Sequence, residues 1–139
     1  MTTRKLSFLD SSLTEEQWFQ VWGRAARWHR EVIRALHPLG ITPAQYAVLR
    51  ALVRLSGKTE DALRQRALVD ETDLSASLVS QALRALGDRG LVDCGINGVD
   101  ARASRLLCTA KGRKLLEQAK PLVDAATRAA AKNPTERPH

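Results

Sequence analysis

The sequence predicts a mainly α-helical domain that carries one small β-hairpin. Apolar residues recur at helical spacing over most of the chain, which is typical of amphipathic helices. Residues 91–108 instead read as two short strands around a tip that contains Gly and Asn. The length of 139 residues suits one domain of ordinary size. We therefore expect a single domain over residues 1–139.

The composition is that of a folded protein. Hydrophobic residues make up 44% of the chain and charged residues 27%, which suffices for a packed core. No apolar run approaches the roughly 20 residues needed to cross a bilayer, and the N-terminus lacks the apolar core of a secretion signal. We expect a cytoplasmic protein without a membrane partner.

The positive charge is concentrated in the last part of the chain. Residues 101–139 hold nine Lys and Arg against three Asp and Glu, whereas residues 41–100 hold seven against eight, within a net charge of +7. A basic surface attracts DNA phosphates through counterion release. Because surplus Lys and Arg also serve solubility, charge alone leaves the partner open.

The first helix is expected to start near Ser12 or Thr14, where Gln17 completes a capping box, and to end before Pro38. It carries two adjacent apolar faces, which favours burial against its own domain on one side and against a partner chain on the other. A central helix of a monomer is the alternative. One face comprises Phe19, Trp22, Ala26, His29, Ile33 and Leu36, and the other comprises Trp18, Val21, Ala25, Trp28 and Val32.

Three further helices are expected before the hairpin. The first begins at Thr42, with Pro43 in its first turn and Gln45 completing a capping box. The second covers residues 60–74. The third covers about residues 75–89, with Leu78, Val79, Ala82, Leu83 and Leu86 predicted to face inward.

The outer side of the helix over residues 75–89 is polar. Small side chains there permit close approach to a major groove, while Gln81 and Arg84 are long enough to reach base edges. A solvated polar face is the alternative. The outer residues are Ser75, Ala76, Ser77, Ser80, Gln81 and Arg84.

The hairpin follows this helix directly. Its strands are expected at residues 91–94 and 104–108, with Asp100 and Arg102 at the tip. A recognition helix followed by a basic hairpin is the arrangement by which a winged helix-turn-helix holds DNA, and we assign residues 41–108 to such a lobe. Thr109 then caps a final helix, which Pro121 should bend or divide.

Residues 42 to about 120 resemble the multiple-antibiotic-resistance regulator (MarR) family of bacterial transcription regulators. The resemblance implies a homodimer in which residues 12–37 and 109–132 form dimerisation helices beneath two winged helix-turn-helix lobes. The matching segments are Thr42-Pro43-Ala44-Gln45, Leu78-Val79-Ser80, residues 86–92, Asp100-Ala101-Arg102-Ala103 and Thr109-Ala110-Lys111-Gly112.

The resemblance also implies how a palindromic operator would be bound. Arg102 would enter the minor groove, where narrow grooves attract Arg, with Asp100 orienting its guanidinium. A local ion pair is the alternative, and Ala101 stands where the family often has a second basic residue. The expected DNA-binding residues are Arg64, Ser75, Ser77, Ser80, Gln81, Arg84, Asp100, Arg102 and Arg105.

Members of this family commonly bind small, often aromatic, anions between the dimer region and the lobe. The resemblance thus implies a repressor that a small aromatic or anionic effector releases from DNA. An ordinary packing role is the alternative for each residue of the expected pocket. These residues are Trp22, Ala26, His29 and Tyr46, with Arg30 as the anion partner.

Two alternatives to an effector-controlled DNA-binding regulator remain. One is a winged helix that binds a protein. The other is redox control, because a hairpin symmetric about residue 101 would place Cys94 opposite Cys108; strand packing is the simpler role for both thiols. The sequence shows no nucleophile–base pair, metal-ligand spacing or phosphate loop, so we expect neither catalysis nor a metal or cofactor.

Overall fold

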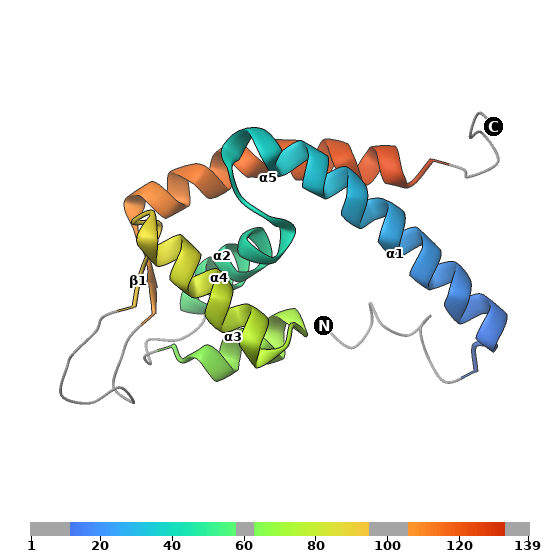
Figure 1. Cartoon of the computed structure of the whole chain (residues 1–139), viewed down its shortest axis with the longest axis horizontal. Helices are drawn as coiled ribbons and strands as arrows, with labels where there is room; N and C mark the ends of the chain where they lie inside the picture. Colours follow the sequence, from blue (N-terminus) through green and yellow to red (C-terminus); the bar gives the residue numbers. More distant parts are fainter. Residues whose placement is uncertain (1–11, 58–62, 95–105, 133–139) are drawn as a thin grey trace.

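The computed structural model describes residues 12–57, 63–94 and 106–132. Two long helices, α1 and α5, cross beside a lobe that contains the shorter helices and the base of the hairpin (Figure 1). The predicted fold class, mainly α with a small β-hairpin, is confirmed. The elements are α1 (Glu15–Leu36), the 3-10 helix η2 (His37–Leu39), α2 (Pro43–Ser56), α3 (Gln65–Thr72), α4 (Ala76–Asp88), β1 (Val92–Asp93), β2 (Leu107–Cys108) and α5 (Ala110–Ala130).

Side-chain caps account for where the helices start. Thr14 and Gln17 form a capping box at α1, and Thr42 and Gln45 form another at α2, as the sequence predicts. The Thr109 hydroxyl accepts the Gly112 N–H at the start of α5, also as expected. Local polar chemistry therefore places these three helix starts.

Helix α3 is shorter than predicted. We expected a helix over residues 60–74, but Arg64 has extended backbone (φ −120°, ψ 160°), and residues 60–62 lie outside the described residues. At the other end, Asp73 adopts the left-handed conformation with φ 59°, which ends the helix before Leu74. The extended backbone at Arg64 therefore precedes the first residue of α3, Gln65.

Helix α5 runs without a break through Pro121, so the helix is not divided at this residue; the predicted bend stays a prediction. Proline removes one main-chain hydrogen bond, here to the carbonyl of Glu117, which is exposed and open to water. Ala119 and Val123, on either side of the proline, are both buried. Packing on both sides of the proline therefore accompanies the continuous helix.

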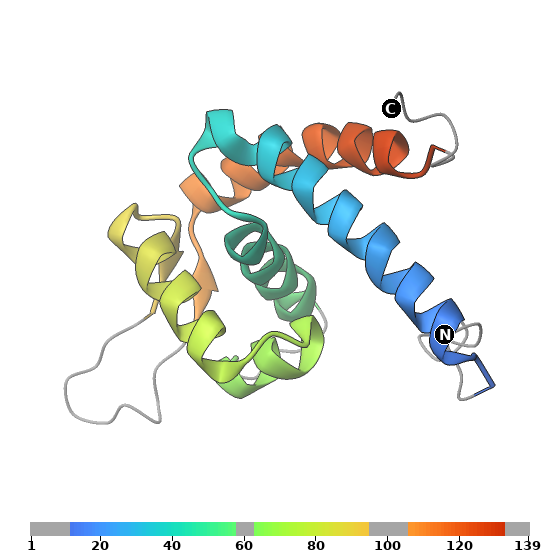
Figure 2. The same ribbon diagram turned by 45° about the vertical axis from the view of Figure 1, so that its right-hand side comes forward.

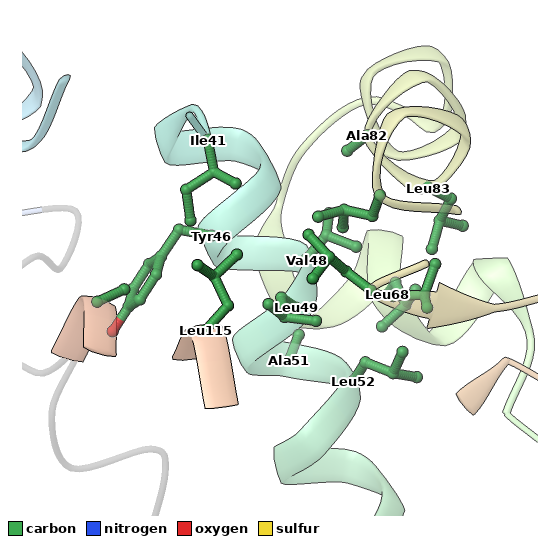
Figure 3. Packing of buried hydrophobic residues seen from close by; sticks show 14 of the residues in the cluster. Ile41, Tyr46, Val48, Leu49, Ala51, Leu52, Leu68, Ala82, Leu83 and Leu115 are labelled. Carbon is green, nitrogen blue, oxygen red and sulfur yellow. The ribbon is translucent and has the colours of Figure 1, made fainter. Parts of the chain in front are cut away.

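The core of the lobe lies between α2, α3 and α4. Leu49 and Leu52 of α2 meet Leu68 of α3 and the inner face of α4, as the close view shows (Figure 3). Val79 and Leu86 are fully buried on α4. Leu78 was predicted to face inward with them, but its side chain is 45% exposed. Leu78 stands at the edge of the apolar stripe, where spacing alone does not separate inside from outside.

Helix α1 uses its two apolar faces differently. Val32 is buried, and the Trp28 indole N–H donates to the Thr127 hydroxyl of α5 at 2.9 Å. On the other face, Phe19 and Trp22 are 54% and 66% exposed. In two views the N-terminal half of α1 stands apart from the remaining helices (Figures 1 and 2). None of the described helices is long and apolar enough to cross a membrane.

Candidate nucleic-acid interface

The start of α4 is held by a small set of hydrogen bonds. The Ser75 hydroxyl accepts the Leu78 N–H at 3.1 Å, as an N-cap does. Gln65 on α3 donates from its side-chain amide to the Ala76 carbonyl at 3.3 Å. These contacts fix the turn between α3 and α4, and so the orientation of α4 relative to α3.

The outer face of α4 presents polar side chains at successive turns. Ser77, Gln81 and Arg84 are exposed, and Ser80 is half-buried beside them. The Gln81 amide nitrogen donates to the Ser77 hydroxyl at 3.3 Å, which leaves the Gln81 side-chain oxygen as an acceptor. Within the described part of the chain, no hydrogen bond or ion pair engages Arg84. The face therefore offers both donors and acceptors outward.

A cleft of about 1020 Å³ lies beside α4, between its C-terminal half, the start of α3 and the base of the hairpin. Arg64 and Arg84, both predicted to bind DNA, come from different elements and line the same cleft, and Asp88 also lines it. Arg66, which the prediction did not include, lines it too and pairs with Asp70 at 3.5 Å. Its position two residues after Arg64 in an Arg-Gln-Arg run is the signal that could have identified it.

The hairpin base is attached to this cleft. The Leu106 N–H donates to the Leu63 carbonyl at 3.4 Å, and this bond joins the second strand to the segment before α3. The residues expected at the wing, Asp100, Arg102 and Arg105, lie outside the described residues. Their predicted contact with the minor groove stays a prediction.

The five residues expected to bind an effector do not share one surface of the single chain. Trp22, His29 and Arg30 are exposed on α1, and Ala26 is half-buried on the same helix. Tyr46 is buried, with its ring extending from α2 toward α5 (Figure 3). Burial raises the pKa of Tyr46 above its ordinary value, so its hydroxyl stays neutral near pH 7.

Arg27 is a second cation on α1 that the prediction did not include. It is half-buried, and its Nε atom is buried without a hydrogen-bond partner in the described part of the chain. A buried guanidinium nitrogen without an acceptor is unfavourable. An anion carried by a ligand is one group that would satisfy it, and Arg27 is thus a stronger candidate than the exposed Arg30.

The strand register contradicts the predicted pairing of the cysteines. Cys108 pairs with Val92, and Leu107 pairs with Asp93, so the hairpin is symmetric about residue 100. Cys94 and Cys108 are therefore diagonal neighbours, which lie about 7–8 Å apart in antiparallel strands, with a somewhat shorter Cβ–Cβ distance that still exceeds the roughly 4 Å of a disulfide. Both cysteines are free.

Burial raises the pKa of both thiols. For Cys94 the negative charge of Asp93 adds to the effect, whereas for Cys108 the positive charge of Arg113 partly offsets it. A raised pKa lowers the thiolate fraction and with it the reactivity. Among the described residues, no group of three His, Cys, Asp or Glu side chains is placed to hold a metal ion.

Helix, turn, recognition-type helix and hairpin base together define a winged helix-turn-helix protein. The model of the MarR family matches residues 39–103 of this chain. This match covers just under half of the chain, and the solved structures described next agree with it in fold over most of the chain. The resemblance predicted from the sequence is therefore confirmed.

Three solved structures are similar over most of the chain. CouR from Rhodococcus jostii, bound to p-coumaroyl-CoA, is 25% identical with a TM-score of 0.68, over 93% of this chain and 85% of that one. A MarR-family transcriptional regulator from Rhodococcus sp. is 25% identical with a TM-score of 0.71, over 90% and 86%. Rv2887 of Mycobacterium tuberculosis, in complex with DNA, is 26% identical with a TM-score of 0.64, over 81% and 79%. None of the curated proteins matches this chain.

Proposed function

We propose that this chain is a transcriptional regulator that binds a palindromic double-stranded operator as a homodimer. The observation that carries the proposal is the outward polar face of α4 beside a cleft lined by three arginines, Arg64, Arg66 and Arg84. A helix face with short side chains, an amide and a guanidinium suits base edges in the major groove. The arginines beside it suit the phosphate backbone.

The two kinds of contact have different roles in this proposal. Ser77, Gln81 and Arg84 point outward from α4 and enter the major groove, with Ser75 and Ser80 at its margins. Arg64 and Arg66 lie across the cleft and contact phosphates, which fix the register of the protein on the duplex. Arg102 at the wing, oriented by Asp100, contacts the minor groove. Rv2887, at 26% identity, was solved in complex with DNA, which supports DNA as the partner in this proposal.

A second copy of the chain covers the exposed face of α1. Phe19 and Trp22 form a tilted aromatic pair with ring centroids 5.7 Å apart, and both remain exposed in the single chain. Ile33, about three turns after Trp22 on the same face, is 45% exposed. A contiguous apolar stripe of this kind on a soluble protein marks an interface. Residues 12–37 and 109–132 would then form the dimer region and residues 41–108 the DNA-binding lobe.

Control by an effector is the finer part of the proposal. CouR, at 25% identity, was solved with an anionic aromatic thioester, p-coumaroyl-CoA. In this chain Arg27 supplies a half-buried cation on α1, and its Nε atom has no hydrogen-bond partner in the described part of the chain. An aromatic anion bound there would shift the two lobes and release the operator, which makes the protein a repressor.

Selection of bound duplexes from a random pool tests the proposed function. We expect a palindrome with half-sites about one helical turn apart. Binding to the selected duplex should weaken steeply as salt rises, because each phosphate contact releases counterions. A pool that yields no enriched sequence, together with binding that is indifferent to salt, would show that this winged helix contacts another kind of partner.

A further inference from the structure

The recognition helix carries one large apolar side chain that the core does not use. Leu78 is the third residue of α4 and is 45% exposed. The other large apolar residues of the helix, Val79, Leu83 and Leu86, are buried. Leu78 therefore adds little to the folding of the lobe and offers its methyl groups outward.

The position of Leu78 is well defined by its neighbours. Its main-chain N–H is held by the Ser75 hydroxyl at 3.1 Å, so the first turn of α4 is capped at this residue. Gln81 follows three residues later, which places the two side chains next to each other on the helix surface. Leu78 thus lies at the N-terminal end of the outer face, the end that reaches base edges in helix-turn-helix proteins.

Base edges in the major groove present one distinctive apolar group, the 5-methyl of thymine. We propose that Leu78 contacts this methyl group at one thymine of each half-site, and so makes the protein discriminate thymine from bases that lack it. This inference rests on the proposed DNA-binding function. It assigns base discrimination to a residue that makes no hydrogen bond with its side chain.

The hydrogen-bonding residues of α4 do not account for such a preference. Gln81 and Arg84 discriminate bases through donors and acceptors, which thymine and uracil share. Only a contact with the methyl group distinguishes thymine from uracil, and an apolar side chain makes such a contact. Leu107 is 48% exposed, slightly more than Leu78, but lies on β2 rather than on α4. It therefore provides a control of matched size and exposure.

The experiment replaces each thymine of the selected operator in turn by deoxyuridine, which removes only the methyl group. With the parent protein, one position in each half-site should lose about fourfold in affinity, the ratio that burial of one methyl group gives. Leu78→Ala should bind the thymine and deoxyuridine operators equally. Leu107→Ala should keep the fourfold ratio. Leu78→Met, which keeps the apolar bulk, should keep most of it.

Each outcome decides between the inference and its alternatives. If no thymine is sensitive, or if Leu78→Ala keeps the parent ratio, Leu78 does not contact a methyl group, although the protein binds DNA. If the parent binds no duplex at all, the proposed function itself is wrong and the inference falls with it. Circular dichroism shows whether Leu78→Ala is folded. If it is not, Leu78→Gln, which keeps the length of the side chain but not its apolar end, takes its place and should lose the ratio; a folded Leu78→Gln with the parent ratio would overturn the inference.

Discussion

The guanidinium of Arg89 donates to the main-chain carbonyl of Gly40 at 2.9 Å, and so joins the end of α4 to the connection between α1 and α2. A second nitrogen of the same group donates to Leu39 at 3.2 Å. In return, the Arg89 carbonyl accepts a hydrogen bond from Lys111 on α5 at 2.9 Å. Arg89 therefore connects the C-terminal end of the proposed recognition helix to the α1–α2 connection and to α5. A change in the arrangement of α1 and α5 would reach the DNA-binding face through these hydrogen bonds.

Arg89→Gln should loosen this junction. The shorter neutral side chain loses both bonds to the carbonyls, and hydrogen bonds of this kind contribute about 1 kcal/mol to stability when partly solvated. We expect the free energy of unfolding in urea to fall by about that amount at fixed protein concentration. Lys114→Gln, which removes an exposed cation from the same end of α5, should leave it unchanged. Equal stability of the two variants would show that the junction carries no net energy.

Gly112 should not tolerate a side chain. A Cβ at this position would overlap the main-chain oxygen of Leu91 and lie 2.9 Å from the Cys108 sulfur. Although Gly→Ala normally stabilises a helix, overpacking of this kind costs about 1–3 kcal/mol. Gly87 on α4 has open space in the described structure, and Gly87→Ala should raise stability by roughly 0.5–1 kcal/mol. Thermal unfolding of both variants tests the opposite signs.

Arg84→Ala should weaken binding to the selected operator. If Arg84 contacts a base, the loss is about 1–3 kcal/mol, and the preference at that base relaxes. Arg128→Ala removes an exposed arginine from the far end of α5 and should bind as the parent does. Fluorescence titration with the operator and with single-base variants measures both effects. Parent-like binding by Arg84→Ala would place the DNA on another face.

Trp22→Glu should dissociate the proposed dimer. The exposed indole is replaced by a charge in an interface whose face is otherwise apolar, so association becomes unfavourable. Analytical ultracentrifugation should show the monomer at concentrations where the parent is dimeric. Gln20→Glu adds the same charge on the opposite side of α1 and should remain a dimer. A monomeric parent protein would contradict the role given to this face.

The two thiols should remain reduced in the folded protein. Because burial raises the pKa of both Cys94 and Cys108, their thiolate fraction near pH 7 is below that of free cysteine, and alkylation should be slower. The rate should rise with pH toward and above the ordinary thiol pKa. Two reactive thiols per chain should still be counted after mild peroxide treatment and denaturation. If both thiols disappear and the mass falls only by two hydrogen atoms, a disulfide between Cys94 and Cys108 has formed, contrary to this prediction.

Much of the fold follows from local sequence. Thr14 and Thr42 each have a glutamine three residues later, and the hydrogen bonds of these caps form within four residues, so helix starts are readable without the rest of the chain. The two apolar faces of α1 are readable for the same reason, since helical geometry alone determines which residues share a face. The candidate DNA-binding residues of α4 follow from that geometry together with the family resemblance.

The burial of Leu78, the strand register and the continuity of α5 could not be predicted from sequence, because they depend on contacts between distant segments. Leu78 is outside the core because α2 and α3 cover only part of α4. The hairpin is centred on residue 100 instead of 101, so the pairing of the two strands differs by two residues from the expected one. Pro121 stays inside a continuous helix, with Ala119 and Val123 buried on either side of it. Local sequence accounts for the starts of α1, α2 and α5 and for the resemblance to the family. Only tertiary packing decided which apolar side chains remain outside, because burial is a property of the surfaces that meet.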